Sequence, residues 1–146
     1  MKINLLNSVI IGVVSTIGMS ILMLVLSNLG FPEMNPPKMM AHIMHQSLFV
    51  GWIIHLMIGI TFSIMFHILY NWKLHTKSWY LNGVIFGILA WILAQIGFGV
   101  IGAVAGMPPA RNGSMELMIA GSILTHLFFG FCVAIGFNLL VQKKLK

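Results

Sequence analysis

The stretch that decides the fold is HLMIGITFSIMF, His55 to Phe66, in which the histidine is the only ionisable side chain. It belongs to a mainly apolar run, Ser47–Tyr70, and about 20 such residues suffice for an α-helix to cross a bilayer. Three more runs qualify: Ser8–Leu29, Leu81–Val104 and Leu117–Val141. The chain of 146 residues is 59% hydrophobic and 7% charged, whereas a soluble domain carries about 25% charged residues. We therefore predict an all-α, integral membrane four-helix bundle that fills the chain as a single domain.

The positive charges are placed as topology signals. The net charge is +6, but its position argues against nucleic acid as a partner. An excess of Lys and Arg marks the cytoplasmic side of a membrane protein. The excess lies at the N-terminus, in the second loop and at the C-terminus: Lys2, Lys73, Lys77, Lys143, Lys144 and Lys146. We predict a bacterial inner-membrane protein with both termini in the cytoplasm and the two proline-containing loops outside.

The opening stretch has a counterpart 71 residues later, HLFFGFCVAIGF, His126 to Phe137. The histidine, the glycine four residues on and the final phenylalanine recur, and Gly12 matches Gly83 at the same offset. The outer loops MNPPK and GMPPAR correspond with a slip of one residue. We predict a duplicated two-helix unit, with repeats at about 1–72 and 73–146 in the same orientation. The two histidines would then lie at equal depth, about 12 Å from the outer end of their helices.

Each predicted span carries a stripe of small or polar residues at four-residue spacing. In the second span the stripe is Gly51, His55, Gly59 and Ser63, and in the fourth it is Ser122, His126, Gly130, Ala134 and Asn138. Small residues let membrane helices approach closely, so the stripes should face the interior of the bundle. On a purely structural interpretation the histidines bond there to each other, to Thr125 or to Gln95.

The pairing of the histidines favours a sharper hypothesis. An ionisable residue within a membrane is costly and points to a functional site. His55 and His126 could supply both axial ligands of one haem iron. Gly59 and Gly130 would leave room for the flat macrocycle, and Lys38 and Arg111 in the outer loops would meet the haem propionates.

A second metal hypothesis concerns EMNPPKMMAHIMHQ, Glu33 to Gln46. Thioethers favour Cu(I), and imidazole serves copper generally. The candidate copper ligands are His42, His45, Met39 and Met44. The structural alternative is that the methionines are flexible packing material near the membrane interface.

The sequence favours a non-catalytic protein. Its two carboxylates, Glu33 and Glu116, lie outside the predicted spans, and phosphate-binding, zinc-protease and serine-triad motifs are absent. The leading interpretation is a membrane subunit or accessory protein that works with other membrane subunits or associates with itself. One alternative is a small oligomeric transporter or channel, with Thr16, Gln95 and the two histidines along a polar route. A packing scaffold without a cofactor is the other.

Two resemblances accompany this pattern. Paired histidines across a four-helix bundle resemble the architecture of membrane b-type cytochromes, which often use a second histidine about 14 residues along each helix. Leu69 and Leu140 occupy those positions here, which limits the chain to one haem. The four spans, with GWIIHLMIG (Gly51–Gly59) in the second and GVIFGILAWILAQ (Gly83–Gln95) in the third, resemble a group of small bacterial membrane proteins of unknown function. That resemblance implies the topology and no activity.

Overall fold

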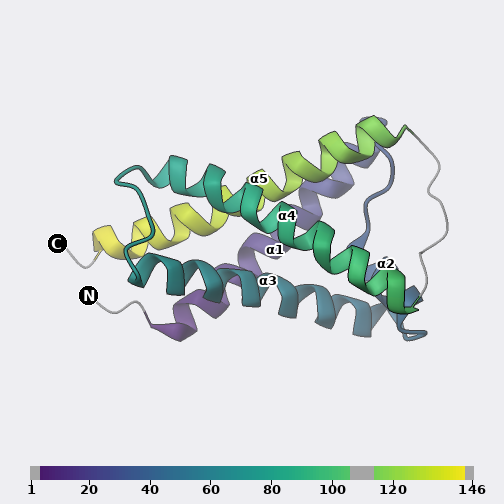
Figure 1. The fold of residues 1–146 in the computed structure, drawn as a ribbon, viewed down its shortest axis with the longest axis horizontal. Coiled ribbons are helices and arrows are strands. Elements are labelled where there is room, and N and C mark those ends of the chain that lie inside the picture. Colours follow the sequence, from purple (N-terminus) through teal and green to yellow (C-terminus); the bar gives the residue numbers. More distant parts are fainter. Residues whose placement is uncertain (1–3, 106–113, 144–146) are drawn as a thin grey trace.

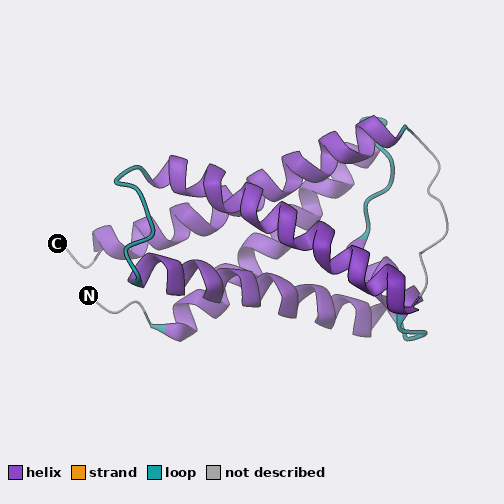
Figure 2. Cartoon of the chain, in the orientation of Figure 1, coloured by secondary structure: helices purple, strands orange, loops and turns teal. Residues whose placement is uncertain are grey.

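The protein forms a bundle of long helices in the computed structural model, which describes residues 4–105 and 114–143 (Figure 1). Helix is the only regular secondary structure in those residues (Figure 2). Four helices are long and apolar enough to cross a membrane: α1 (Leu5–Asn28), α3 (Leu48–Asn71), α4 (Trp79–Ala105) and α5 (Met115–Lys143). The predicted all-α membrane bundle is thus confirmed, with each helix boundary within three residues of the predicted span.

Polar side chains cap the N-termini of α1 and α3. The side chains of Asn4 and Ser47 accept hydrogen bonds from the backbone N–H groups of Leu6 and Val50 at the starts of α1 and α3. Such caps satisfy N–H groups that have no partner within the helix. The long helices expose Leu, Ile and Val side chains around much of their outer surface, as lipid-facing helices do.

A short helix, α2 (Pro36–Ile43), was not predicted as a separate element. Pro36 and Pro37, which were assigned to a loop, form its first turn, where proline has no N–H group to leave unpaired. Asn35 caps it by accepting from the N–H of Lys38. A Cβ atom on Gly51 would collide with the carbonyl group of Pro37, so glycine is what lets α2 lie directly on α3.

The long helices pack in the order α3, α1, α5, α4 around the bundle, whereas α3 and α4 make few close contacts in the described residues. Glycines form the closest approaches. A Cβ on Gly12 of α1 would lie 2.7 Å from the Ile60 Cα of α3, and one on Gly83 of α4 would lie 3.1 Å from the Phe131 Cα of α5. The residues of the second contact are those of the first moved by 71 positions.

A core of apolar side chains lies between the helices. Phe66, Phe86, Phe129 and Phe137 pack together with Val133 between the helices. Both described chain ends and the α3–α4 loop lie at one end of the bundle, and α2 lies at the other (Figure 1). This arrangement is compatible with the predicted topology. The side of the membrane on which the termini lie stays a prediction.

Candidate functional site

A cavity of about 520 Å³ lies at the end of the bundle that carries α2. All five helices contribute to its lining, which is mostly apolar. His55 and Phe62 come from α3, Gln95 from α4, and His126 and Phe129 from α5. The volume falls within the range of about 300–1,000 Å³ that is typical of small-molecule sites. The bundle interior therefore contains a ligand-sized space, and both predicted histidines reach it.

His55 is held by α1. Its side chain is 7% exposed, and its Nε2 lies 3.3 Å from the Ser20 Oγ. The Ser20 hydroxyl donates to the backbone carbonyl of Thr16 at 2.9 Å, which leaves the Ser20 oxygen free to accept from the imidazole. Trp52, one turn earlier on α3, meets the ring edge-on. Among the described residues, His55 therefore makes one rather long hydrogen bond, to the neighbouring helix α1.

His126 is oriented by its own helix. Its Nδ1 lies 2.7 Å from the backbone carbonyl oxygen of Ser122. A carbonyl oxygen only accepts, so Nδ1 carries the proton, and in a neutral imidazole Nε2 then carries the lone pair. The hydrogen bond found for His126 in the described part of the chain is the one made by Nδ1, which leaves Nε2 without a partner there. His126 thus presents an available nitrogen donor at the cavity.

The two histidines face one cavity from different helices. They line the same cavity, yet no hydrogen bond joins them in the described residues. The partners considered on the structural interpretation were each other, Thr125 and Gln95. The partners found are instead Ser20 for His55 and the Ser122 carbonyl for His126.

Gly59 and Gly130, the predicted glycines beside the macrocycle, lie at close helix contacts. A Cβ on Gly59 would collide with the Thr16 Oγ1 of α1, and the glycine also borders the cavity. A Cβ on Gly130 would collide with the carbonyl group of Gly83 on α4. Both glycines thus allow close helix packing, and their role beside a macrocycle stays a prediction.

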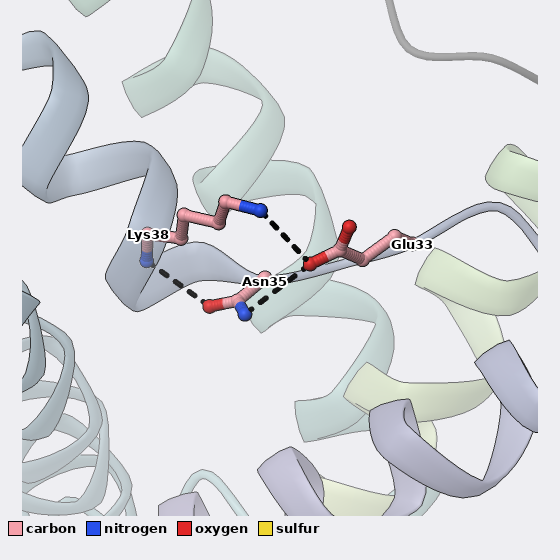
Figure 3. A network of polar contacts seen from close by, with 3 residues as sticks. All are labelled: Glu33, Asn35 and Lys38. Atoms are coloured by element: carbon pink, nitrogen blue, oxygen red, sulfur yellow. Dashed lines mark hydrogen bonds and ion pairs between the residues drawn. The ribbon is translucent and has the colours of Figure 1, made fainter.

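Lys38, one of the two predicted cations, does not line the cavity. The Lys38 ammonium lies at the surface of α2, 3.6 Å from the Glu33 carboxylate, and both side chains are mostly exposed. Asn35 joins them by bonds to the Glu33 side chain and the Lys38 backbone (Figure 3). Arg111 lies outside the described residues.

The structure disperses the predicted copper ligands. Met39 lines the cavity, whereas Met44 is 54% exposed and His42 and His45 are also at the surface. No group of three or more His, Cys, Asp or Glu residues suited to a metal ion occurs in the described ranges. Sequence reasoning had noted the cluster on α2 but missed that methionines from four segments converge. Those lining the cavity are Met19, Met23, Met34, Met39, Met40, Met115 and Met118.

The residues predicted for a transport route also converge here. Thr16 and Gln95 line the cavity together with the two histidines. Phe129 belongs both to the cavity lining and to the phenylalanine core. A transport route through these residues stays a prediction.

Trp91 is a cavity residue that sequence reasoning had assigned no functional role. Its indole Nε1 is buried without a hydrogen-bond partner among the described residues. Buried polar groups are normally paired, so an unpaired donor at a cavity calls for an explanation. The available signal was its spacing, one turn before Gln95 and one turn after Gly87.

Comparison with known proteins identifies one match. A family described as a family of unknown function (DUF6789) matches residues 3–145. No curated protein and no solved structure matches the chain.

Proposed function

We propose that this chain, which belongs to the family of unknown function DUF6789, binds one b-type haem between His55 and His126. In this proposal it serves as a non-catalytic subunit or accessory protein of a membrane redox complex. Both imidazoles line one apolar cavity of ligand size, and they come from different helices. Paired neutral imidazoles in an apolar pocket are a ligand set suited to haem iron.

The observation that carries the proposal is the bond from His126 Nδ1 to the Ser122 carbonyl. A metal-bound histidine almost always donates its other ring N–H to a carbonyl, carboxylate or water, which fixes its tautomer and raises its basicity. Here this arrangement is already formed, with Nε2 left for the iron. The Nδ1 bond of His126 stays within its own helix, whereas His55 directs its Nε2 to Ser20 of α1.

His55 requires a small rearrangement. Ligation through Nε2 would move its proton to Nδ1 and break the 3.3 Å contact with Ser20. Ser20 would keep its bond to the Thr16 carbonyl, so no serine hydroxyl would be left unpaired. Only one long contact is lost, and its cost is small against two iron–nitrogen bonds.

The proposal includes the duplication. Packing of Gly12 against Ile60, and of Gly83 against Phe131, supports two equivalent two-helix units. If they are equivalent, the α1–α5 contact has a potential counterpart between α3 and α4, and the cavity lies where that counterpart is nearly absent. The ligand would fill the gap between the units. A chain with one haem cannot alone carry electrons across a membrane, which supports a role beside partner subunits.

Visible spectroscopy tests the proposal. The protein is purified in mild detergent from cells supplied with haem, and its spectra are recorded after oxidation and after dithionite reduction. We expect one haem per chain and a Soret band that sharpens on reduction. The band should be lost in the His55→Ala/His126→Ala double variant and kept in the His42→Ala control, because His42 is exposed on α2. A colourless protein despite adequate haem would refute the haem site.

Cu(I) binding is the second candidate, and the methionine lining favours it. Seven methionines border the cavity beside the two histidines. Thioether and imidazole ligands suit Cu(I). If the methionines served only as packing material, no histidine would be required beside them. Competition of the purified protein with a coloured Cu(I) chelator would detect this function. A Met34→Leu/Met40→Leu variant should then release copper more readily, and a Met44→Leu control should not.

A further inference from the structure

A second cavity of about 260 Å³ lies at the end of the bundle opposite the histidine site. Its walls are the last turns of α3, the first turns of α4 and the loop that joins them. It lies on the side where α3 and α4 are not held together by extensive contact. It is therefore a separate chamber, and its occupant need not be that of the first.

The loop that closes this chamber is fixed by Asn82. The Asn82 Oδ1 accepts from the Thr76 backbone N–H at 2.7 Å and from the Thr76 hydroxyl at 2.9 Å. The Asn82 Nδ2 donates to the Thr76 carbonyl at 3.0 Å. Asn82 is 8% exposed, so these bonds are sheltered. These hydrogen bonds thus fix the polar side of the chamber.

The lining changes from apolar to polar toward the loop. Phe66, Phe86 and Leu89 form the deeper part, and they belong to or pack against the core. Toward the loop, the rings of Tyr70 and His75 stack with centroids 4.0 Å apart. A ligand that fits this chamber has an apolar portion and a polar end.

The charges around the mouth are positive. Lys73 and Lys77 flank the three loop residues of the lining, and both are exposed. The only two carboxylates in the chain, Glu33 and Glu116, precede α2 and open α5 at the other end of the bundle. Trp72 and Leu74, 70% and 66% exposed, add an apolar rim typical of a membrane interface.

We propose that this chamber binds one anionic phospholipid. Its acyl chain would lie against Phe66, Phe86 and Leu89, and its phosphate would meet Lys73, Lys77 and the His75 ring. Paired lysines beside a membrane attract anionic lipid, and here no carboxylate competes for them. A second copy of the chain is less suitable, because an identical loop would bring like charges together. The inference goes beyond haem binding and does not depend on it.

Native mass spectrometry tests this site on the full chain, released from nanodiscs of phosphatidylcholine and phosphatidylglycerol in equal amounts. We expect the wild-type protein to retain one phosphatidylglycerol. A Lys73→Gln/Lys77→Gln variant should retain at least about tenfold less, whereas Lys38→Gln, which removes a lysine at the other end, should retain it normally. Equal retention of both lipids would overturn the proposal, as would equal loss in the Lys38 control. The haem spectrum of the double variant should be unchanged, which separates failure here from failure of the haem proposal.

Discussion

At the residue scale, the glycines make the two helix pairs possible. Gly59 of α3 faces Thr16 of α1, and Gly130 of α5 faces Gly83 and Gly87 of α4. Lipid provides no hydrophobic drive for helix association, so close backbone approach is a main source of helix–helix attraction. A methyl group that separates two helices should therefore destabilise the bundle by more than its own local clash.

Gly130→Ala should destabilise the bundle by about 1–3 kcal/mol, the usual cost of overpacking. The new methyl group would meet the backbone of α4, which has no flexible side chain to move aside. Thermal unfolding in detergent measures the effect. Gly97→Ala on α4 is the matched control, since a Cβ there meets nothing within 4 Å. Equal stability of the two variants would contradict the packing account.

The Ser8–His67 pair should contribute modestly to stability. The Ser8 Oγ and the His67 Nδ1 are 2.7 Å apart, and both residues are buried. Hydrogen bonds within membranes couple by about 0.6 kcal/mol on average, with a maximum of about 1.7 kcal/mol. A double-mutant cycle with Ser8→Ala and His67→Leu should give a coupling in that range. A coupling of zero would show that the two side chains act independently.

Sequence reasoning placed both histidines on inward helix faces but did not predict their hydrogen-bond partners. Four-residue spacing indicates which residues share a helix face, and it placed His55 and His126 correctly toward the interior. It does not tell which helix lies opposite, so the Thr16 beside Gly59 and the unpaired Trp91 indole could not be foreseen. The Ser122 carbonyl is a backbone atom, and no residue pattern records it.

At the element scale, α2 is the helix that was not predicted from the sequence. Its eight residues, PPKMMAHI, are too few for a clear helical period, and the two prolines were assigned to an outer loop. Pro36, Met39, Met40 and Ile43 of this helix line the cavity. α2 therefore forms the outer wall of the site, held on α3 where Gly51 meets Pro37.

Gly51→Ala should weaken haem binding by about tenfold, which corresponds to about 1.4 kcal/mol. The added methyl group would collide with the Pro37 carbonyl group and push α2 away from α3. Titration of haem into the purified apoprotein measures the affinity, with Gly97→Ala as the control on an open surface. An unchanged affinity would mean that α2 is not part of the binding wall.

At the scale of the whole molecule, hydropathy was enough to predict four spans, because every span is nearly all apolar. The cavity was not predictable in the same way. It lies where α3 and α4 make few close contacts, and those contacts depend on how all the helices pack against one another. The predicted 71-residue repeat would make the two units equivalent, whereas the difference between the α1–α5 and α3–α4 contacts is visible only in three dimensions.

The predicted topology is open to direct labelling. In a Cys132→Ser background, Lys38→Cys and Lys77→Cys place single thiols on exposed positions at opposite ends of the bundle. A maleimide that does not cross membranes should label Lys38→Cys in intact cells. It should label Lys77→Cys only after the membrane is opened. The reverse pattern would place both termini outside.

The central claim is that His55 and His126 together ligate one haem. Electron paramagnetic resonance of the ferric protein tests it most directly, because two imidazole ligands give a low-spin iron and loss of one gives a high-spin iron. We predict a low-spin signal for the wild type that becomes high-spin in both His55→Ala and His126→Ala. A high-spin signal in the wild type, or a low-spin signal that survives either substitution, would contradict the paired site.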